Sequence, residues 1–253
     1  MTSEGPLNVT VVVPTYNEAG NLPALAAELL ALPFPGLRVL VVDDASPDGT
    51  GRLADELASV SAGRLAVLHR TGPRGLGRAY LDGFRRALEN GADIVVQMDA
   101  DLSHAPVDVP RLADELTDCD VAVGSRYVAG GKVDYRWGVK RRALSRSANL
   151  LSRMILGLRT RDATAGFKAW RRSALEAVDL GRVRSNGYLF QEEMAFLSER
   201  LTLRIREIPI FFADRQIGRS KMSAKTKLEA AIGLIRLRRR HRKVRALPVL
   251  VPE

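Results

Sequence analysis

Short apolar segments alternate with longer amphipathic segments through the first half of the chain. The apolar segments are rich in β-branched residues, as buried strands are, and they lie at residues 9–14, 37–43, 64–69, 93–99 and 120–125. The segments between them repeat their apolar residues with helical spacing, and they lie at residues 21–32, 49–60 and 75–91. Strands that alternate with helices form βαβ units. The pattern therefore predicts an α/β fold with a mostly parallel central sheet flanked by helices.

The second half of the chain is more basic than the first. Residues 132–161 hold nine lysines and arginines and a single acid, Asp134. Apolar residues recur with helical spacing within residues 140–157, which predicts an amphipathic helix with arginines on its other faces.

Three further elements are expected towards the C-terminus. We predict a helix at residues 187–201, a strand at residues 204–212 and an amphipathic helix that runs from residue 227 into a cationic cluster. We accordingly divide the chain into an α/β domain, residues 1–222, and a basic C-terminal helix and tail, residues 223–253.

Charge and cysteine content restrict the partners. The chain has 39 lysines and arginines against 29 acids, a net charge of +10, which favours nucleic acid, anionic lipid or a phosphorylated substrate. A solvated basic surface would have the same composition.

The single cysteine, Cys119, excludes an intrachain disulfide and a zinc site built from cysteine pairs. The N-terminus lacks the pattern of a signal peptide, and no stretch reaches the roughly 18 apolar residues that span a bilayer, so we predict a soluble or peripheral protein.

Polar loops follow the first four predicted strands. They read "PTYNEAGN", "DDASPDGT", "RTGPRGLG" and "DADLSHAP". The carboxyl ends of parallel strands meet at one edge of a sheet, where α/β proteins bind their ligands. We therefore expect these loops to form one crevice.

The fourth loop contains two aspartates, Asp99 and Asp101, separated by one alanine. Residues i and i+2 of an extended backbone point the same way, so both carboxylates can face one cation. Mg²⁺ usually takes one or two carboxylates and completes its shell with water and substrate phosphates. The alternative is an aspartate that caps the helix expected near Pro106. A single D-x-D is common by chance, but its position at the end of a strand favours the metal.

Acids in the first two loops are candidates for nucleoside binding. Glu18, Asp43 and Asp44 can accept hydrogen bonds from ribose hydroxyls or from a base. Ordinary turn and cap chemistry is the alternative, and we predict a plain turn at Asp48 and Gly49.

Cations follow other predicted elements. Arg126 comes directly after the fifth strand, and Arg215, Arg219 and Lys221 lie in a stretch rich in small residues. Arginine and lysine in these places suit a pyrophosphate, although an exposed basic loop is the alternative.

The remaining motifs are weaker. Gly75 and Gly77 match neither a P-loop nor a complete dinucleotide fingerprint, so loop geometry is the better interpretation. The histidines His69, His104 and His241 do not have metal-ligand spacing, and no Ser-His-Asp arrangement is readable. We predict that His104 is a loop residue and not a ligand.

Several of these motifs together resemble a known family. The segments "VVVPTYNEAGNL", "VVDDASPDGT", "RGLGRAYLDGF", "MDADLSHAP", "GSRYVAGG", "WGVKRRALSRSAN", "DATAGFKAW" and "IGRSKMS" are similar to those of the polyprenyl-phosphate (dolichyl-phosphate) mannose synthases, which are family 2 glycosyltransferases with the GT-A fold. The resemblance extends from about residue 9 to residue 223. "PTYNE" and D-x-D are common to the wider family, whereas "DADLSH" and the segment after Trp137 point to the polyprenyl-phosphate branch.

The resemblance implies a role for each matching residue. The nucleoside of GDP-mannose would be held by Pro14, Tyr16, Glu18, Val42 and Asp44. Mg²⁺ or Mn²⁺ would be bound by Asp99, Asp101 and Ser103, and Ala100 lies between these ligands against the donor. Lys168, Arg215 and Lys221 would close over the donor phosphates. The lipid phosphate would be met by Arg126, Arg141 and Ser145, so that Asp99, Asp101 and Arg126 are the catalytic residues.

The function implied by the resemblance is inverting transfer of mannose from GDP-mannose to polyprenyl phosphate. One alternative is transfer of glucose from UDP-glucose to the same lipid, because the sugar pocket is not legible in the sequence. A non-catalytic nucleic-acid-binding protein would explain the net charge but not the acids collected at the strand ends, so we expect no nucleic acid partner. A nucleotidyltransferase would normally have a glycine-rich basic loop where this chain has "PTYNE".

The tail suggests where such an enzyme would work. Seven lysines and arginines lie within residues 236–245, and each contributes on the order of 1 kcal/mol near an anionic leaflet. We predict a cytoplasmic protein that binds peripherally to the inner face of the membrane. A solvated tail that contacts a membrane-anchoring partner protein is the alternative.

Overall fold

A computed structural model describes residues 7–187, 189–214 and 224–244 of the chain. Its strands are β1 (Val9–Thr15), β2 (Leu37–Asp43), β3 (Leu65–His69), β4 (Ile94–Gln97), β5 (Val121–Ser125), β6 (Lys132–Val133), β7 (Lys168–Arg171), β8 (Ile205–Pro209) and β9 (Phe211–Phe212). Its helices are α1 (Leu22–Leu30), α2 (Thr50–Ser59), α3 (Leu76–Glu89), α4 (Asp108–Glu115), α5 (Val139–Leu156), α6 (Arg172–Val178), α7 (Leu189–Arg200) and α8 (Ala224–Arg240).

The main sheet has seven strands in the order β3-β2-β1-β4-β7-β5-β8. Every neighbouring pair is parallel except the two pairs that involve β7, which runs antiparallel to both β4 and β5. The predicted α/β fold with a mostly parallel sheet is therefore confirmed. The predicted strand at residues 204–212 is wrong as a single element, because β8 and β9 are separated at Ile210 and β9 pairs with β6 in a second sheet.

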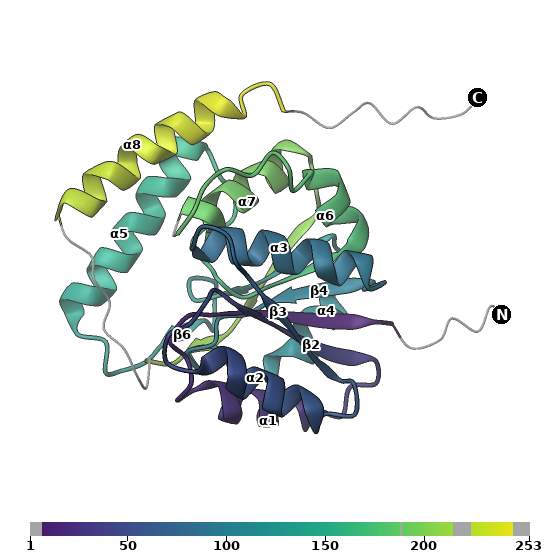
Figure 1. Ribbon diagram of the computed structural model, residues 1–253. Helices are drawn as coiled ribbons and strands as arrows, with labels where there is room; N and C mark the ends of the chain where they lie inside the picture. Colours follow the sequence, from purple (N-terminus) through teal and green to yellow (C-terminus); the bar gives the residue numbers. More distant parts are fainter. Residues whose placement is uncertain (1–6, 188, 215–223, 245–253) are drawn as a thin grey trace, which may run out of the picture.

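Helices cover both faces of the main sheet (Figure 1), with α1, α2 and α4 on one side and α3, α6 and α7 on the other. Because side chains alternate along a strand, Val11 and Val13 pack on one side and Val12 on the other, and all three are fully buried. A Cβ atom at Gly83 would lie 2.4 Å from Val12 Cγ1. The glycine lets α3 approach the sheet closely, which fixes the helix beside the strand ends.

Helices α5 and α8 lie side by side beyond the carboxyl ends of the strands (Figure 1). A third apolar cluster joins them to α7, with Leu156, Phe196 and Leu237 among its buried members. The predicted basic C-terminal helix is confirmed, whereas its proposed boundary at residue 223 lies outside the described residues. None of the helices in the described part of the chain is both long enough and apolar enough to cross a membrane.

Candidate functional site

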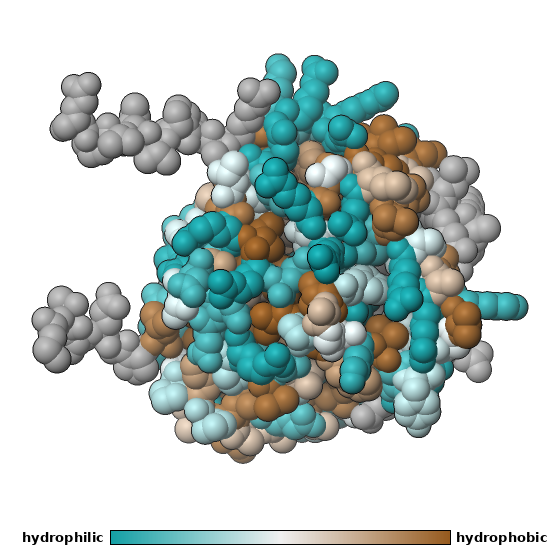
Figure 2. Space-filling view, turned by 180° about the vertical axis from the view of Figure 1, so that it is seen from behind, coloured by the Kyte–Doolittle hydropathy of each residue, from teal (hydrophilic) through white to brown (hydrophobic). Residues whose placement is uncertain are grey.

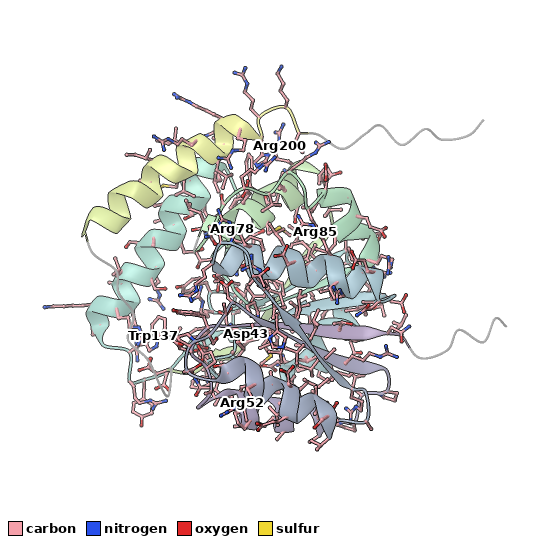
Figure 3. All side chains as sticks on the ribbon, in the orientation of Figure 1. Asp43, Arg52, Arg78, Arg85, Trp137 and Arg200 are labelled. Carbon is pink, nitrogen blue, oxygen red and sulfur yellow. The ribbon has the colours of Figure 1, made fainter. Side chains whose placement is uncertain are left out.

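The expected crevice lies where strand order reverses, because β1 has β2 on one side and β4 on the other. Figure 3 shows Asp43 at these strand ends, below α3 in this view. The Asp43 carboxylate accepts hydrogen bonds from Thr15 Oγ1 (3.3 Å) and from the backbone nitrogen of Ser46 (3.2 Å). Asp43 therefore holds the first two loops together, as the turn interpretation predicts.

The aspartate pair lies just beyond β4, which ends at Gln97. Asp99 and Asp101 are thus loop residues, with a bend of the backbone at Ala100 between them, and their joint binding of one cation stays a prediction. Tyr80 of α3 donates a hydrogen bond to Asp99 Oδ1 (2.6 Å), and the backbone nitrogen of Ser103 donates to Asp101 Oδ1 (3.1 Å). Burial, followed by the Asp99 carboxylate, raises the pKa of Tyr80 well above its usual value, so its hydroxyl keeps the proton it donates.

The donor atoms around the aspartate pair fit a hard divalent cation. Ser103 is buried, and its Oγ has no hydrogen-bond partner among the described residues, as a hydroxyl reserved for a ligand would have none. A Cβ at Gly166 would come within 2.8 Å of Asp99 Oδ2, so glycine leaves that carboxylate oxygen accessible. The described residues contain no group of three or more His, Cys, Asp or Glu side chains suited to a metal. Two carboxylates and a hydroxyl leave coordination positions for substrate phosphates.

His104 lies in the same loop as this pair, and its side chain is buried. Its exposed fraction is 2%, and its ring packs against Phe167 and Phe212 with centroids 4.9 and 5.0 Å away. His104 Nε2 is 3.9 Å from Asp99 Oδ2. His104 lies in a loop, as predicted, and its buried ring packs against two aromatic residues beside the D-x-D pair.

Lys168 lies at the start of β7, opposite Gln97 of β4. It is 1% exposed, and its Nζ donates to Gln191 Oε1 (2.9 Å), which also accepts from Gln97 Nε2 (2.7 Å). Burial lowers the pKa of Lys168 to about 8. Lys168 is thus held within the central sheet by Gln191, and its contact with the donor phosphates stays a prediction.

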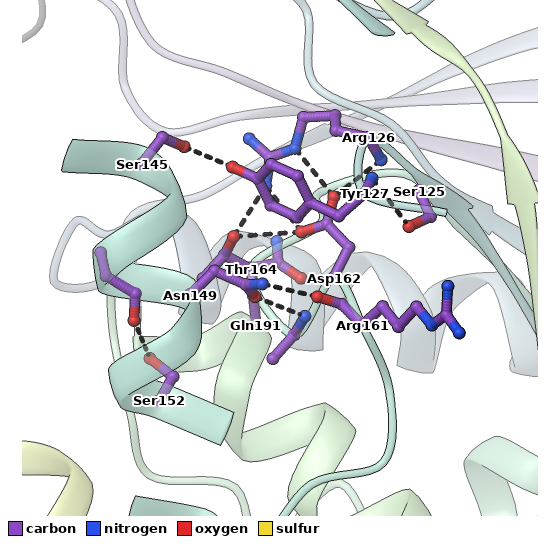
Figure 4. Close-up of polar contacts among 12 residues, drawn as sticks. Ser125, Arg126, Tyr127, Ser145, Asn149, Ser152, Arg161, Asp162, Thr164 and Gln191 are labelled. Carbon is purple, nitrogen blue, oxygen red and sulfur yellow. Dashed lines mark hydrogen bonds and ion pairs between the residues drawn. The ribbon is translucent and has the colours of Figure 1, made fainter. Parts of the chain in front are cut away.

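Arg126 and Asp162 form a buried ion pair beside the sheet (Figure 4). The guanidinium donates to both carboxylate oxygens, with Nε–Oδ2 2.8 Å and Nη2–Oδ1 2.7 Å, and Nη2 also donates to Thr164 Oγ1 (2.7 Å). Burial alone would lower the pKa of Arg126, but the Asp162 carboxylate raises it, so the guanidinium stays charged. Its position is therefore set by the protein before any substrate binds.

A cationic pocket of about 430 Å³ opens next to Arg126. Its lining includes Arg126, Ser145, Arg142 and Arg146 together with the indole of Trp137. The two α5 arginines have no carboxylate partner among the described residues, and Trp137 Nε1, although buried, has no hydrogen-bond partner there either. The pocket therefore offers donors and positive charge to an anion.

The three residues expected at the lipid phosphate are only partly brought together. Arg126 and Ser145 line the pocket, and Ser145 Oγ shares a hydrogen bond of 2.7 Å with the Tyr127 hydroxyl (Figure 4). Arg141 instead binds Asp214 (2.6 Å) and stacks on Trp137, 3.9 Å from the ring centroid. It therefore supports the pocket wall from behind the indole.

The nucleoside side of the crevice is built by Tyr16, Asp44 and the turn before α3. Tyr16 is 42% exposed and lies under the Arg74 guanidinium, 4.6 Å from the ring centroid. Asp44 is buried and binds Arg70, while its Oδ2 accepts from the backbone nitrogen of Gly75 (2.6 Å). Both carboxylate oxygens of Asp44 thus already have partners.

The other expected donor residues differ in accessibility. Glu18 is half-buried and accepts from Asn21 Nδ2 (2.7 Å). Pro14 and Ala100 are buried. Val42 is fully buried, and its side chain packs beneath α3; its contact with the base stays a prediction. The expected phosphate ligands Arg215 and Lys221 lie outside the described residues.

Some residues of the site are not evident from the sequence. Tyr80 lies on the apolar face of a helix, where an aromatic residue is normally read as core. Arg142 and Arg146 have a detectable signal, since their spacing of four residues places both on one helical face, adjacent to that of Arg141 and Ser145.

The chain belongs to glycosyl transferase family 2, whose family model matches residues 10–179. It is 47% identical over 221 residues to the polyprenol monophosphomannose synthase of Mycolicibacterium smegmatis, covering 87% of this chain and 83% of the relative. It is 46% identical over 230 residues to the undecaprenyl-phosphate mannosyltransferase of Micrococcus luteus, covering 91% and 93%. The resemblance inferred from the motifs is therefore confirmed.

Solved structures support the same fold. A mannosyltransferase from Pyrobaculum calidifontis in complex with GDP-Man and Mn²⁺ superposes with a TM-score of 0.65 at 22% identity, covering 96% of this chain and 67% of that one. Glucosyl-3-phosphoglycerate synthase from Mycobacterium tuberculosis, with Mn²⁺, UDP and its product, gives a TM-score of 0.63 at 20% identity, covering 92% and 80%. At these identities the similarity establishes the fold.

Glu192 of α7 is a buried acid that connects this site to α5. Its Oε1 accepts a hydrogen bond from Ser152 Oγ (3.2 Å), while its Oε2 is buried and has no hydrogen-bond partner in the described part of the chain. Burial raises the pKa of Glu192 to about 7. The folded protein therefore releases this proton at higher pH than the unfolded chain, whose carboxyl has an ordinary pKa.

We expect Glu192→Gln to stabilise the protein at pH 8 but not at pH 5. Between the ordinary glutamate pKa and about 7 the folded state binds more protons, so wild-type stability falls as pH rises through this window. The variant avoids the buried charge, and its gain in unfolding free energy at pH 8 should be on the order of 2 kcal/mol. Urea denaturation at both pH values measures it, with the exposed Glu176→Gln as control. An equal effect at pH 5 and pH 8 would contradict the expectation.

Proposed function

We propose that this protein transfers mannose, with inversion, from GDP-mannose to a polyprenyl phosphate, giving polyprenyl-phosphate mannose. The proposal rests on two unlike sites that lie close together: a carboxylate crevice around Asp99 and Asp101, and a cationic pocket lined by α5. Arg126 connects them, because it lines the pocket and its charge interacts with that of Asp99. A nucleotide-sugar transferase that uses an anionic acceptor needs both. The names of the relatives above supply the mannosyl group and the polyprenyl phosphate.

On this proposal the two substrates enter from opposite walls. Tyr16, Glu18 and Asp44 would hold the nucleoside, and Asp99, Asp101 and Ser103 would hold Mg²⁺ or Mn²⁺. When bound, that ion would neutralise charge on the departing nucleoside diphosphate. Arg126, Arg142 and Ser145 would meet the lipid phosphate, and Arg215 and Lys221 remain predicted ligands of the donor phosphates.

The proposed reaction does not need a strong general base. The second pKa of a phosphate monoester is about 6, so the acceptor is already a dianion at neutral pH. One phosphate oxygen attacks the anomeric carbon of mannose while the bond from that carbon to the GDP oxygen breaks, and GDP leaves with the electron pair. No proton has to move. The barrier is the approach of two anionic groups, which the positive charges of Arg142 and Arg146 would lower while Arg126 offers a preset hydrogen-bond donor.

A transfer assay with a panel of donors tests the proposal directly. Purified protein, a polyprenyl phosphate, Mg²⁺ and GDP- or UDP-sugars should give lipid-linked sugar from GDP-mannose, and EDTA should abolish the product. If only UDP-glucose gives product, the proposed reaction type stands and the proposed donor is wrong. The absence of product from every donor would overturn the proposed activity for the isolated chain.

The aspartate pair gives a sharper test. Asp99→Asn keeps the size of the side chain and an acceptor for Tyr80 but removes the charge, so turnover should fall at least about 100-fold. The melting temperature should change little. Asp179→Asn is the matched control, because Asp179 is exposed and has a left-handed backbone (φ 54°) that asparagine tolerates. Near-normal turnover by Asp99→Asn would contradict the proposed role of Asp99 in binding the metal.

We also propose that the α5–α8 side faces an anionic membrane. Arg238, Arg239 and Arg242 border a groove of about 500 Å³ that also includes Ile155 and Ile235. Figure 2 shows brown side chains gathered beside long teal ones over this side of the molecule. A surface that is both apolar and cationic suits the headgroup region of the inner leaflet. Through Ile155 this groove shares α5 with the lipid-phosphate pocket.

Vesicle sedimentation tests this orientation. We expect binding to vesicles with anionic lipid to fall at least about tenfold when Arg239 and Arg242 are both changed to glutamate, because each reversal removes an attraction and adds a repulsion. Arg52→Glu, on α2, reverses an exposed charge away from this side (Figure 3) and should change binding little. Equal binding of the wild type to neutral vesicles in high salt would contradict the expectation.

A further inference from the structure

Asn186 holds the turn that precedes α3. Its Oδ1 accepts a hydrogen bond from the backbone nitrogen of Gly77 (3.2 Å), and its Nδ2 donates to the carbonyl of Arg74 (3.4 Å). A Cβ atom on Gly75 would lie 1.9 Å from Asn186 Nδ2, so the asparagine fits against the turn only because that residue is glycine. A segment distant in sequence thereby fixes the path of residues 74–77.

This turn forms part of the nucleoside side of the crevice. The backbone nitrogen of Gly75 donates to Asp44 Oδ2 (2.6 Å), and Arg74 Nη1 donates to the Tyr16 hydroxyl (2.7 Å). Arg74 Nη2 also donates to the carbonyl of Ala45 (3.1 Å). A shift of the turn would therefore move the carboxylate and the aromatic ring that we place against the nucleoside.

Glu193 of α7 anchors the segment that carries Asn186. Its side chain is fully buried, and Oε2 accepts from the backbone nitrogens of Arg184 (3.0 Å) and Ser185 (2.6 Å). Its Oε1 lies 2.6 Å from Nε2 of His241, which is 3% exposed and lies just beyond α8, and 3.4 Å from Arg240 Nη1. Burial alone would raise the pKa of Glu193, but these hydrogen bonds lower it below its usual value. One carboxylate thus joins α8 to the Asn186 segment.

We propose that Asn186 is a positioning residue for the nucleotide, and that Glu193 transmits the packing of the end of α8 to it. The inference rests on the proposed function only in placing the nucleotide beside Tyr16 and Asp44. The contacts are continuous from His241 through Glu193 and Asn186 to that wall of the crevice. Such a chain of contacts establishes coupling only when both ends are perturbed and the effects are compared.

Nucleotide affinity is the first measurement. For Asn186→Ala the dissociation constant of GDP in the presence of Mn²⁺, measured by calorimetry, should rise about five- to tenfold, the usual effect of losing one or two hydrogen bonds. The donor KM should rise in proportion, while kcat at saturating donor stays within about twofold of wild type. Asn90→Ala, at the exposed far end of α3, is the matched control and should change neither constant.

The coupling to α8 is measured with a second variant. His241→Ala should weaken GDP binding about two- to threefold, and the double variant with Asn186→Ala should be weaker by less than the product of the two single effects. A double variant that shows the full product would overturn the role of Glu193. An unchanged GDP affinity of Asn186→Ala would overturn the positioning role.

The outcome is separable from that of the transfer assay, because the probe is the nucleotide alone. If the wild type binds GDP but transfers no sugar, the proposed function fails while the affinities of the variants still decide the inference. If it binds UDP and not GDP, the same comparison is made with UDP. If Asn186→Ala fails to fold, Asn186→Gln is tested in its place. The longer amide cannot fit against Gly75, so nucleotide binding should weaken in this variant as well. An unchanged nucleotide affinity of Asn186→Gln would also refute the inference.

Discussion

Side-chain acceptors satisfy the backbone of one largely buried irregular segment, residues 158–167, and the geometry of the site depends on them. The Glu199 carboxylate of α7 accepts hydrogen bonds from the backbone nitrogens of residues 159 and 160 in this segment. The Glu207 carboxylate of β8 accepts hydrogen bonds from those of residues 161 and 162. Asn149 of α5 bonds to this segment on both sides of Asp162. Without these acceptors the amides of the buried residues Thr160, Asp162 and Ala163 would be unpaired, each at a cost of about 1–3 kcal/mol. The segment in turn presents Asp162 to Arg126 and leads into β7 beside Lys168.

The charges of the site divide into two kinds. Several arginines at the crevice are bound to acids, as Arg126 is to Asp162 and Arg70 to Asp44, and these pairs set positions while contributing little net charge. The arginines of α5 that line the pocket have no such acid among the described residues. An anion would therefore be attracted to α5, while the paired arginines already hold the positions in which they meet it. Groups that need no rearrangement when the substrate binds can stabilise developing charge more effectively.

The sequence was sufficient for the alternation of strands and helices, because βαβ units have strong periodicity and the strand-end loops have distinctive residues. It was insufficient for β7, since four residues, "KAWR", carry no period and their partners lie on strands distant in sequence. Motif similarity predicts Asp99 and Asp101 as metal ligands, whereas the buried state of Lys168 and Val42 depends on packing that no local pattern encodes. Asn186 and Glu193 lie in segments with ordinary composition, and only the tertiary contacts distinguish them.

The position of β7 has a consequence for how the protein is made. This strand lies between β4 and β5, yet it follows both in the chain, and α5 is synthesised before it. A nascent chain that ends before β7 has a gap in the middle of its sheet, with the edges of β4 and β5 open to other strands. The sheet beneath the crevice therefore becomes continuous only after residues 168–171 have emerged from the ribosome, when two thirds of the chain has already been made.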